Sequence, residues 1–153
     1  MANAQLAESI KVSEVRAVWP RSTVLRVLAA IWVLPVALLG CAGVMAFVLL
    51  GWAQPVISEG ALDVVATGPF ALWMADRHWG AFTFGPCIWY WTEASGRSPH
   101  TRCHEREHVR QYLRWGPAML IAYPVASLWA ALRGGDFYRD NAFERAARNA
   151  SET

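Results

Sequence analysis

The longest uninterrupted run of apolar residues in the chain extends from Val27 to Ala53 and contains no charged residue. A helix of this length spans about 40 Å, more than the roughly 30 Å hydrocarbon core of a bilayer. Trp32 and Trp52 fall near its two ends, where tryptophan favours the membrane–water interface. The alternative, a helix buried in a soluble core, is usually shorter and striped. The pattern therefore predicts a transmembrane helix at residues 27–53, with the lipid bilayer as partner.

The preceding segment, residues 1–26, is polar with some helical periodicity of its apolar positions. It fits an amphipathic segment on a membrane surface and equally well a terminal tail. No basic residue follows the apolar run until Arg77, so the positive-inside rule predicts a cytoplasmic N-terminus. Five arginines in residues 97–114 would then lie on the opposite side, which weakens this orientation. The basic residues before the run are Lys11, Arg16, Arg21 and Arg26.

Two stretches between residues 54 and 97 have the composition of strands and are bounded by turn residues. The first is Ala61–Thr67, and the second is the aromatic-rich Trp79–Trp91. Gly85-Pro86 interrupts the second stretch, which favours an edge strand. The alternative is that these aromatic residues sit in the bilayer interface. We expect a short β-hairpin or small sheet, and thus an α+β, membrane-anchored protein.

A well-marked helix follows these strands. Ser98 suits the N-cap, Pro99 suits the first helical position, and Gly116-Pro117 suits the C-terminal end. The helix contains the H-E-x-x-H motif His104-Glu105-Arg106-Glu107-His108. Residues four apart lie on one helix face, so the two histidines can aim their imidazoles at one point. The alternative is a charged helix with two ordinary histidines.

The motif suits zinc chemistry, because two histidines can bind Zn²⁺ while a glutamate takes a proton from the metal-bound water. A third ligand must come from elsewhere. His100 continues the series, but eight helical residues rise about 12 Å, too far for His100 and His108 to share one ion. Three histidines also suggest a membrane di-iron oxygenase, but the chain's four histidines are too few for that class.

Glu144 is the better candidate for the third ligand. It lies in Asn141–Ala147, a short helical pattern after a turn. Asn141 and Glu144 also have N-cap and N3 spacing, close to a capping box. The same carboxylate oxygens cannot easily serve both roles, so ligand and cap are competing interpretations. Asp140 is a candidate either to support a ligating histidine or to cap the helix.

His104, Glu105, His108 and the downstream Glu144 resemble the gluzincin, or thermolysin-like, zinc metallopeptidases. Within residues 100–148, HEREHVRQYLRWGP and YRDNAFERAA also resemble small membrane proteins of bacteria. The resemblance implies His104, His108 and Glu144 as zinc ligands and Glu105 as the general base. It also implies a location in the bacterial inner membrane.

In this family a strand runs along the substrate cleft, and Ala81–Trp91 is the candidate for that strand. A free edge there would bind an extended peptide through backbone hydrogen bonds. The histidine that commonly helps to hold the oxyanion has no evident counterpart. The candidates for that role are His78, His100 and Tyr138.

The second apolar run, Pro117–Leu132, has 16 residues and no charge. It is short for a span, and Pro124 would kink it. We expect a re-entrant, interfacial or core helix. A full span is the alternative, and it would place His108 and Glu144 on opposite sides of the membrane.

The composition agrees with a membrane protein of one domain. The 153 residues are 55% hydrophobic and 17% charged, whereas about a quarter of the residues in soluble domains are charged. The formal charge of +2 is too small to indicate nucleic-acid binding. The three cysteines, Cys41, Cys87 and Cys103, show no C-x-x-C spacing and no disulfide framework.

The expected organisation is a polar segment at 1–26, a transmembrane helix at 27–53, a zincin-like domain at 54–148 and a tail at 149–153. The expected function is a membrane-anchored zinc hydrolase, most simply a peptidase acting on a peptide or membrane-protein substrate. The alternative is a non-catalytic accessory subunit of a larger membrane complex, with a structural or vestigial metal site. Its tryptophan-rich surface would pack against other membrane chains.

Overall fold

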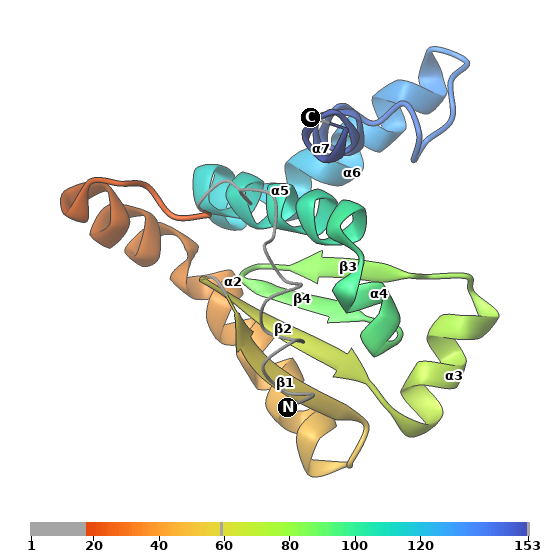
Figure 1. The fold of residues 1–153 in the computed structure, drawn as a ribbon. Coiled ribbons are helices and arrows are strands. Elements are labelled where there is room, and N and C mark those ends of the chain that lie inside the picture. Colours follow the sequence, from red (N-terminus) through yellow and green to blue (C-terminus); the bar gives the residue numbers. More distant parts are fainter. Residues whose placement is uncertain (1–17, 59, 153) are drawn as a thin grey trace.

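The computed structural model describes residues 18–58 and 60–152, so most of the expected segment 1–26 lies outside the described residues. It confirms an α+β fold, in which helices surround one small sheet (Figure 1). The elements are α2 (Thr23–Leu49), β1 (Ala53–Ser58), β2 (Ala61–Ala66), α3 (Gly68–Asp76), β3 (Ala81–Phe84), β4 (Cys87–Tyr90), α4 (Glu93–Arg97), α5 (Pro99–Trp115), a 3₁₀ turn (Gly116–Ala118), α6 (Met119–Leu132) and α7 (Ala142–Ser151).

The sheet has four strands in the order β1-β2-β4-β3 and is mixed. β2 pairs with β1 antiparallel and with β4 parallel, and β3 pairs with β4 antiparallel. The stretch expected as one strand at Trp79–Trp91 is therefore a hairpin, because Gly85 adopts a φ of 60° and turns the chain between β3 and β4. β3 lies at the edge of the sheet, whereas β4 is central. β1 was not expected, and it tolerates Pro55 because it is the other edge strand.

Helix α2 begins at Thr23 rather than Val27 and ends at Leu49 rather than Ala53. It ends there because Gly51 takes a φ of 72°, the left-handed conformation that often follows a helix C-terminus. Two helical stretches of the described chain are long and apolar enough to cross a membrane, Thr23–Leu49 and Pro99–Leu132. In the second, the apolar part follows the charged helix α5.

The core occupies both faces of the sheet, because successive strand residues point to opposite sides. Ile88 and Tyr90 face α5, where they pack with Val109. Val64 and Trp89 face the opposite side and pack with the end of α2 and with α3. One buried stripe of α2 packs into both clusters, so the helix and the expected domain at 54–148 share one core. The stripe is Val33, Val36, Gly40 and Val44.

Helix α5 has the expected ends. The Ser98 hydroxyl accepts a hydrogen bond from the Thr101 amide at 3.3 Å, and Pro99 occupies the first turn. Gly116, with a φ of 52°, ends the helix, and α6 starts directly after the 3₁₀ turn. The chain then folds back, so that α7 lies against α5 (Figure 1).

Candidate metal centre

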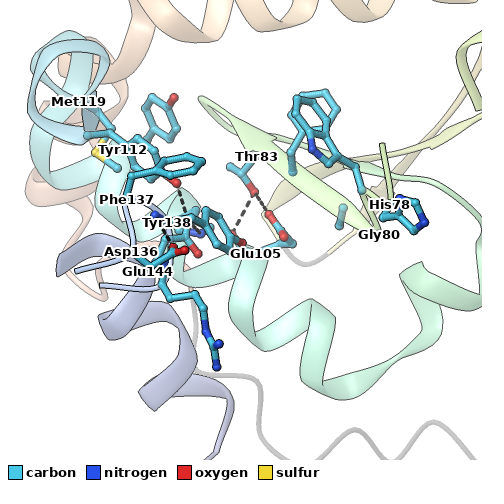
Figure 2. Close-up of a pocket in the computed structure, with 16 residues that line it drawn as sticks. His78, Gly80, Thr83, Glu105, Tyr112, Met119, Asp136, Phe137, Tyr138 and Glu144 are labelled. Atoms are coloured by element: carbon cyan, nitrogen blue, oxygen red, sulfur yellow. Dashed lines mark hydrogen bonds and ion pairs between the residues drawn. The ribbon is translucent and has the colours of Figure 1, made fainter. Parts of the chain in front are cut away.

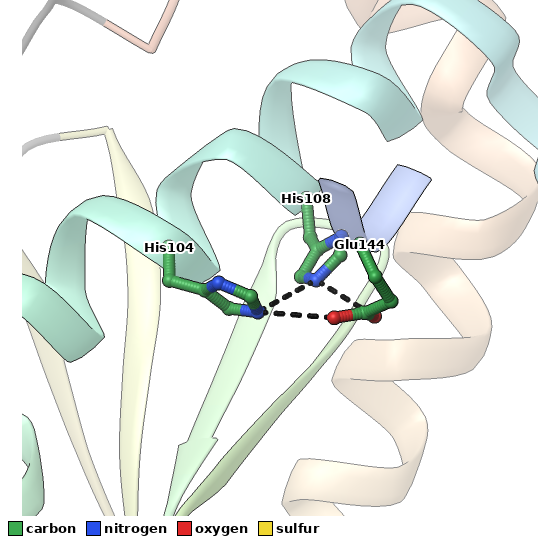
Figure 3. A group of neighbouring side chains, drawn as sticks. All are labelled: His104, His108 and Glu144. Atoms are coloured by element: carbon green, nitrogen blue, oxygen red, sulfur yellow. Dashed lines mark hydrogen bonds and ion pairs between the residues drawn. The ribbon is translucent and has the colours of Figure 1, made fainter. Parts of the chain in front are cut away.

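Three side chains from two helices converge on one point (Figure 3). The Nε2 atoms of His104 and His108 lie 3.2 Å apart. The carboxylate of Glu144 places Oε2 at 3.3 Å from the first of these nitrogens and Oε1 at 3.2 Å from the second. Tetrahedral bonds of about 2.0–2.1 Å separate neighbouring ligand atoms by about 3.3–3.4 Å. The group therefore has the spacing to hold one metal ion.

The buried carboxylate of Glu144 supports the same conclusion. Its side chain is 3% exposed, and Oε2 faces Nε2 of His104 at 3.3 Å. A buried carboxylate is costly unless a positive charge compensates it. A cation between the carboxylate and the two imidazoles would supply that charge.

The position of α7 favours the ligand interpretation of Glu144 over the cap interpretation. Asn141 caps the helix itself, because its Oδ1 accepts a hydrogen bond from the Phe143 amide at 2.8 Å. Glu144 points away from the cap and toward the histidines, and the Tyr123 hydroxyl donates to its Oε1 at 2.7 Å. The chain thus returns after α6 to place Glu144 beside His108. Residues 117–132 therefore do not form a span that separates the two.

Gln111 supports His108 from behind, a role that sequence reasoning missed. Its amide nitrogen donates to the Phe143 carbonyl at 3.0 Å, which turns Oε1 toward Nδ1 of His108 at 2.9 Å. In its neutral form, His108 therefore donates from Nδ1 and presents the lone pair of Nε2 to the centre. The available signal was the 4-3 spacing of His104, His108 and Gln111 on one helix face.

The prediction that Asp140 supports a ligating histidine was wrong. Its Oδ2 accepts a hydrogen bond from the Asp136 amide at 2.8 Å, within the exposed loop before α7. The short side chain of aspartate commonly accepts hydrogen bonds from nearby backbone amides in such turns, so the Asp140 carboxylate is bound within the loop.

Charge interactions within the group shift its protonation. Burial raises the pKa of Glu144, but hydrogen bonds from His104 and His108 outweigh it and hold the pKa well below its usual value. Burial lowers the pKa of His108, but the Glu144 carboxylate and the charge of Glu105 outweigh it and raise the pKa overall. Without a metal, the site thus favours a proton on His108 beside an ionised Glu144.

Glu105 lies beside the group but outside it. Its side chain is buried, and its Oε2 accepts a hydrogen bond from the Thr83 hydroxyl of β3 at 2.7 Å. Burial raises the pKa of Glu105, and the nearby histidines and Thr83 offset only part of this effect. A buried glutamate with a raised pKa beside a candidate metal position is placed as a general base would be.

A cavity of about 790 Å³ opens over these residues (Figure 2). Glu105, His108 and Glu144 line it, together with β3 and the loop after α6. Two of the three oxyanion candidates, His78 and Tyr138, also line the cavity. The third, His100, lies on the first turn of α5 and is not part of the candidate metal centre; its Nε2 lies 3.1 Å from the hydroxyl of Ser151.

No protein-family model, curated protein or solved structure matches the chain. The fold and the site define it as an α+β chain with apolar helices and a buried His-His-Glu group that could hold a metal ion.

Proposed function

We propose that the protein is a membrane-anchored zinc hydrolase that cleaves peptide bonds. The observation that carries the proposal is the convergence of His104, His108 and Glu144, with Glu105 lining the same cavity as His108 and Glu144. Two imidazoles and one carboxylate form a donor set of catalytic zinc sites, in which the fourth position is left for water. Bound zinc would acidify that water and polarise a substrate carbonyl.

The residues around the donor set suit the roles of base and support. Glu105 is buried and held by Thr83, so its carboxylate can accept a proton and return it to a leaving amine. Gln111 and Tyr123 fix one histidine and the carboxylate ligand in position.

The edge strand β3 favours a peptide substrate. β3 pairs with β4 along one side, and Ala81, Phe82 and Thr83 line the cavity. An extended peptide could add to its other edge and bring a backbone carbonyl over the site. This arrangement would bind the peptide backbone independently of most side chains.

The membrane anchor in this proposal is α2, which exposes apolar residues from Val27 to its end at Leu49. Because its inner stripe packs on the sheet, the catalytic unit would lie directly against the anchor. Extraction of membranes at high pH should leave the protein in the pellet. Recovery in the supernatant would mean that α2 is a core helix only.

The test of function compares metal content with hydrolysis in four proteins. Wild type should bind one zinc, and His108→Ala and Glu144→Gln should lose it. Glu105→Gln should keep zinc and lose hydrolysis of a responsive peptide by at least about 10²-fold. Glu107→Gln is the matched control, because Glu107 pairs with Arg110 on the same helix and does not line the cavity.

Two outcomes would contradict this assignment. Equal zinc in wild type and His108→Ala would exclude the metal site, and zinc loss in Glu105→Gln would make Glu105 a ligand rather than a base. Full zinc binding without hydrolysis would favour the accessory-subunit function. The exposed apolar residues of α6, such as Ile121 and Leu128, would then pack against a partner chain.

A further inference from the structure

A row of aromatic rings connects the apolar helix α2 with the cavity. Phe47 of α2 lies 4.5 Å from Phe70 of α3, measured between ring centroids, and Phe70 stacks on Trp73 at 5.7 Å. Trp73 contacts Trp79 at 5.2 Å, and Trp79 contacts Phe82 of β3 at 5.8 Å. The last two residues line the cavity. A continuous series of ring contacts therefore runs from α2 to the lining of the cavity.

The middle of this row is not ordinary core. Trp73 and Trp79 are 39% and 43% exposed, and the neighbouring Leu72 is 72% exposed. The guanidinium of Arg77 lies 4.2 Å from the ring centre of Trp73. Tryptophan beside arginine suits the headgroup region of a bilayer, where a ring meets lipid and a charge meets water.

The row also sits at one end of α2. Trp52, directly after the helix, lies 6.1 Å from Phe47, so both mark the C-terminal end of α2. If α2 is inserted in a bilayer, this end lies at a membrane surface.

The opposite side of the cavity has the same character. Phe137 and Tyr138 are 65% and 47% exposed and line the cavity across from His78 and Gly80 (Figure 2). Just before this loop, the guanidinium of Arg133 lies 4.3 Å from the ring centre of Trp129. Each side of the opening thus has exposed aromatic rings, and an arginine stacks on a tryptophan nearby in the chain.

We propose that Trp73, Trp79, Phe137 and Tyr138 form a bilayer-facing entrance to the cavity, and that its Trp73 and Trp79 side is the one linked by ring contacts to the C-terminal end of α2. The bilayer is favoured over a protein partner because the aromatic row continues the apolar helix. Resting on the proposed function, the substrate is an apolar polypeptide segment next to a membrane, which would slide from the lipid surface onto the edge of β3.

The position of the entrance can be tested without catalysis. Nitroxide labels are placed at Trp79→Cys, Phe137→Cys and, as a control, Glu93→Cys on α4. The background is Cys41→Ser and Cys103→Ser; Cys87 is fully buried and can stay. In lipid nanodiscs, labels at 79 and 137 should be accessible to oxygen and protected from a water-soluble nickel chelate, and the label at 93 should show the reverse. Equal exposure of all three labels to the chelate would overturn the proposal that the entrance faces the bilayer.

The substrate class is tested with one scissile segment in two forms, as a soluble peptide and fused to a transmembrane helix in the same nanodiscs. The tethered form should be cleaved at least about tenfold faster, because anchoring raises its local concentration at the entrance. Trp79→Glu and Phe137→Glu should reduce this advantage and leave zinc content unchanged. Equal rates for the two forms would overturn the substrate class. If neither form is cleaved by zinc-loaded protein, the hydrolase proposal fails, and the nitroxide result alone decides the entrance.

Discussion

Replacing Gln111 with leucine should weaken zinc binding although Gln111 itself does not touch the metal position. Its side chain links Nδ1 of His108 at 2.9 Å to the Phe143 carbonyl at 3.0 Å. Leucine has a similar size but removes both hydrogen bonds. The imidazole then loses the acceptor that fixes its tautomer, and the Phe143 carbonyl loses the hydrogen bond that ties α7 to α5.

The expected size of the effect follows from these two losses. Removing the partner of a ligating histidine typically lowers metal affinity by about 10–100-fold, or about 1.4–2.8 kcal/mol. The Phe143 carbonyl lies inside α7 and keeps its intrahelical donor, so losing the hydrogen bond from Gln111 costs about 0.5–1.5 kcal/mol of unfolding free energy. Gln111→Glu separates the two effects, because it keeps an acceptor for His108 but no longer donates to Phe143. It should bind zinc nearly as tightly as wild type and lose stability.

The measurements are competition for zinc with a chromophoric chelator and denaturant unfolding of the metal-free protein. Arg114→Gln is the control, because Arg114 is exposed on the same helix. Nitrogen NMR of the imidazoles reports directly which ring nitrogen carries the proton. If Gln111→Leu binds zinc like wild type and leaves the His108 tautomer unchanged, Gln111 has no positioning role.

Two further predictions concern protons. Thr83→Val removes the hydrogen bond that lowers the pKa of Glu105, so this pKa should rise further and the acidic limb of the pH–rate profile should move to higher pH; an unchanged profile would contradict the base assignment. Zinc should compete with a proton on His108, whose pKa is raised above 6.5 in the metal-free site, so affinity should fall by up to about tenfold per pH unit as pH drops through that pKa. Titrations that release no protons on zinc binding would contradict this second prediction.

The part of the site that lies on one helix could be predicted from the sequence, because helical spacing is local. His104, Glu105 and His108 fall within one turn and a half, and their relative placement needs no tertiary contact. The role of Glu144 was ambiguous, since its spacing from Asn141 fits a capping box and does not exclude a metal ligand. The two interpretations differ only in where the chain returns after α6, and no local pattern encodes that return.

The sheet was predicted less completely for similar reasons. The composition of Trp79–Trp91 indicates strand, but whether Gly85-Pro86 ends a strand or turns a hairpin depends on what lies beside it. In the fold, Gly85 approaches the backbone of α2 closely, and an added Cβ would lie 3.1 Å from the Val36 carbonyl oxygen. The hairpin tip thus fits against the helix, and this contact also makes α2 part of the core.

Asn141 explains how the site can exist before a metal binds. It is fully buried, and its Nδ2 donates to the Tyr123 carbonyl at 3.2 Å and to the Ser127 hydroxyl at 2.8 Å, while its Oδ1 caps α7. These bonds hold the start of α7 on α6 three residues before Glu144. Gln111 holds the same helix on α5 through Phe143. The carboxylate is therefore placed by contacts that do not involve the metal, so zinc would bind a prepared site and would not have to assemble it.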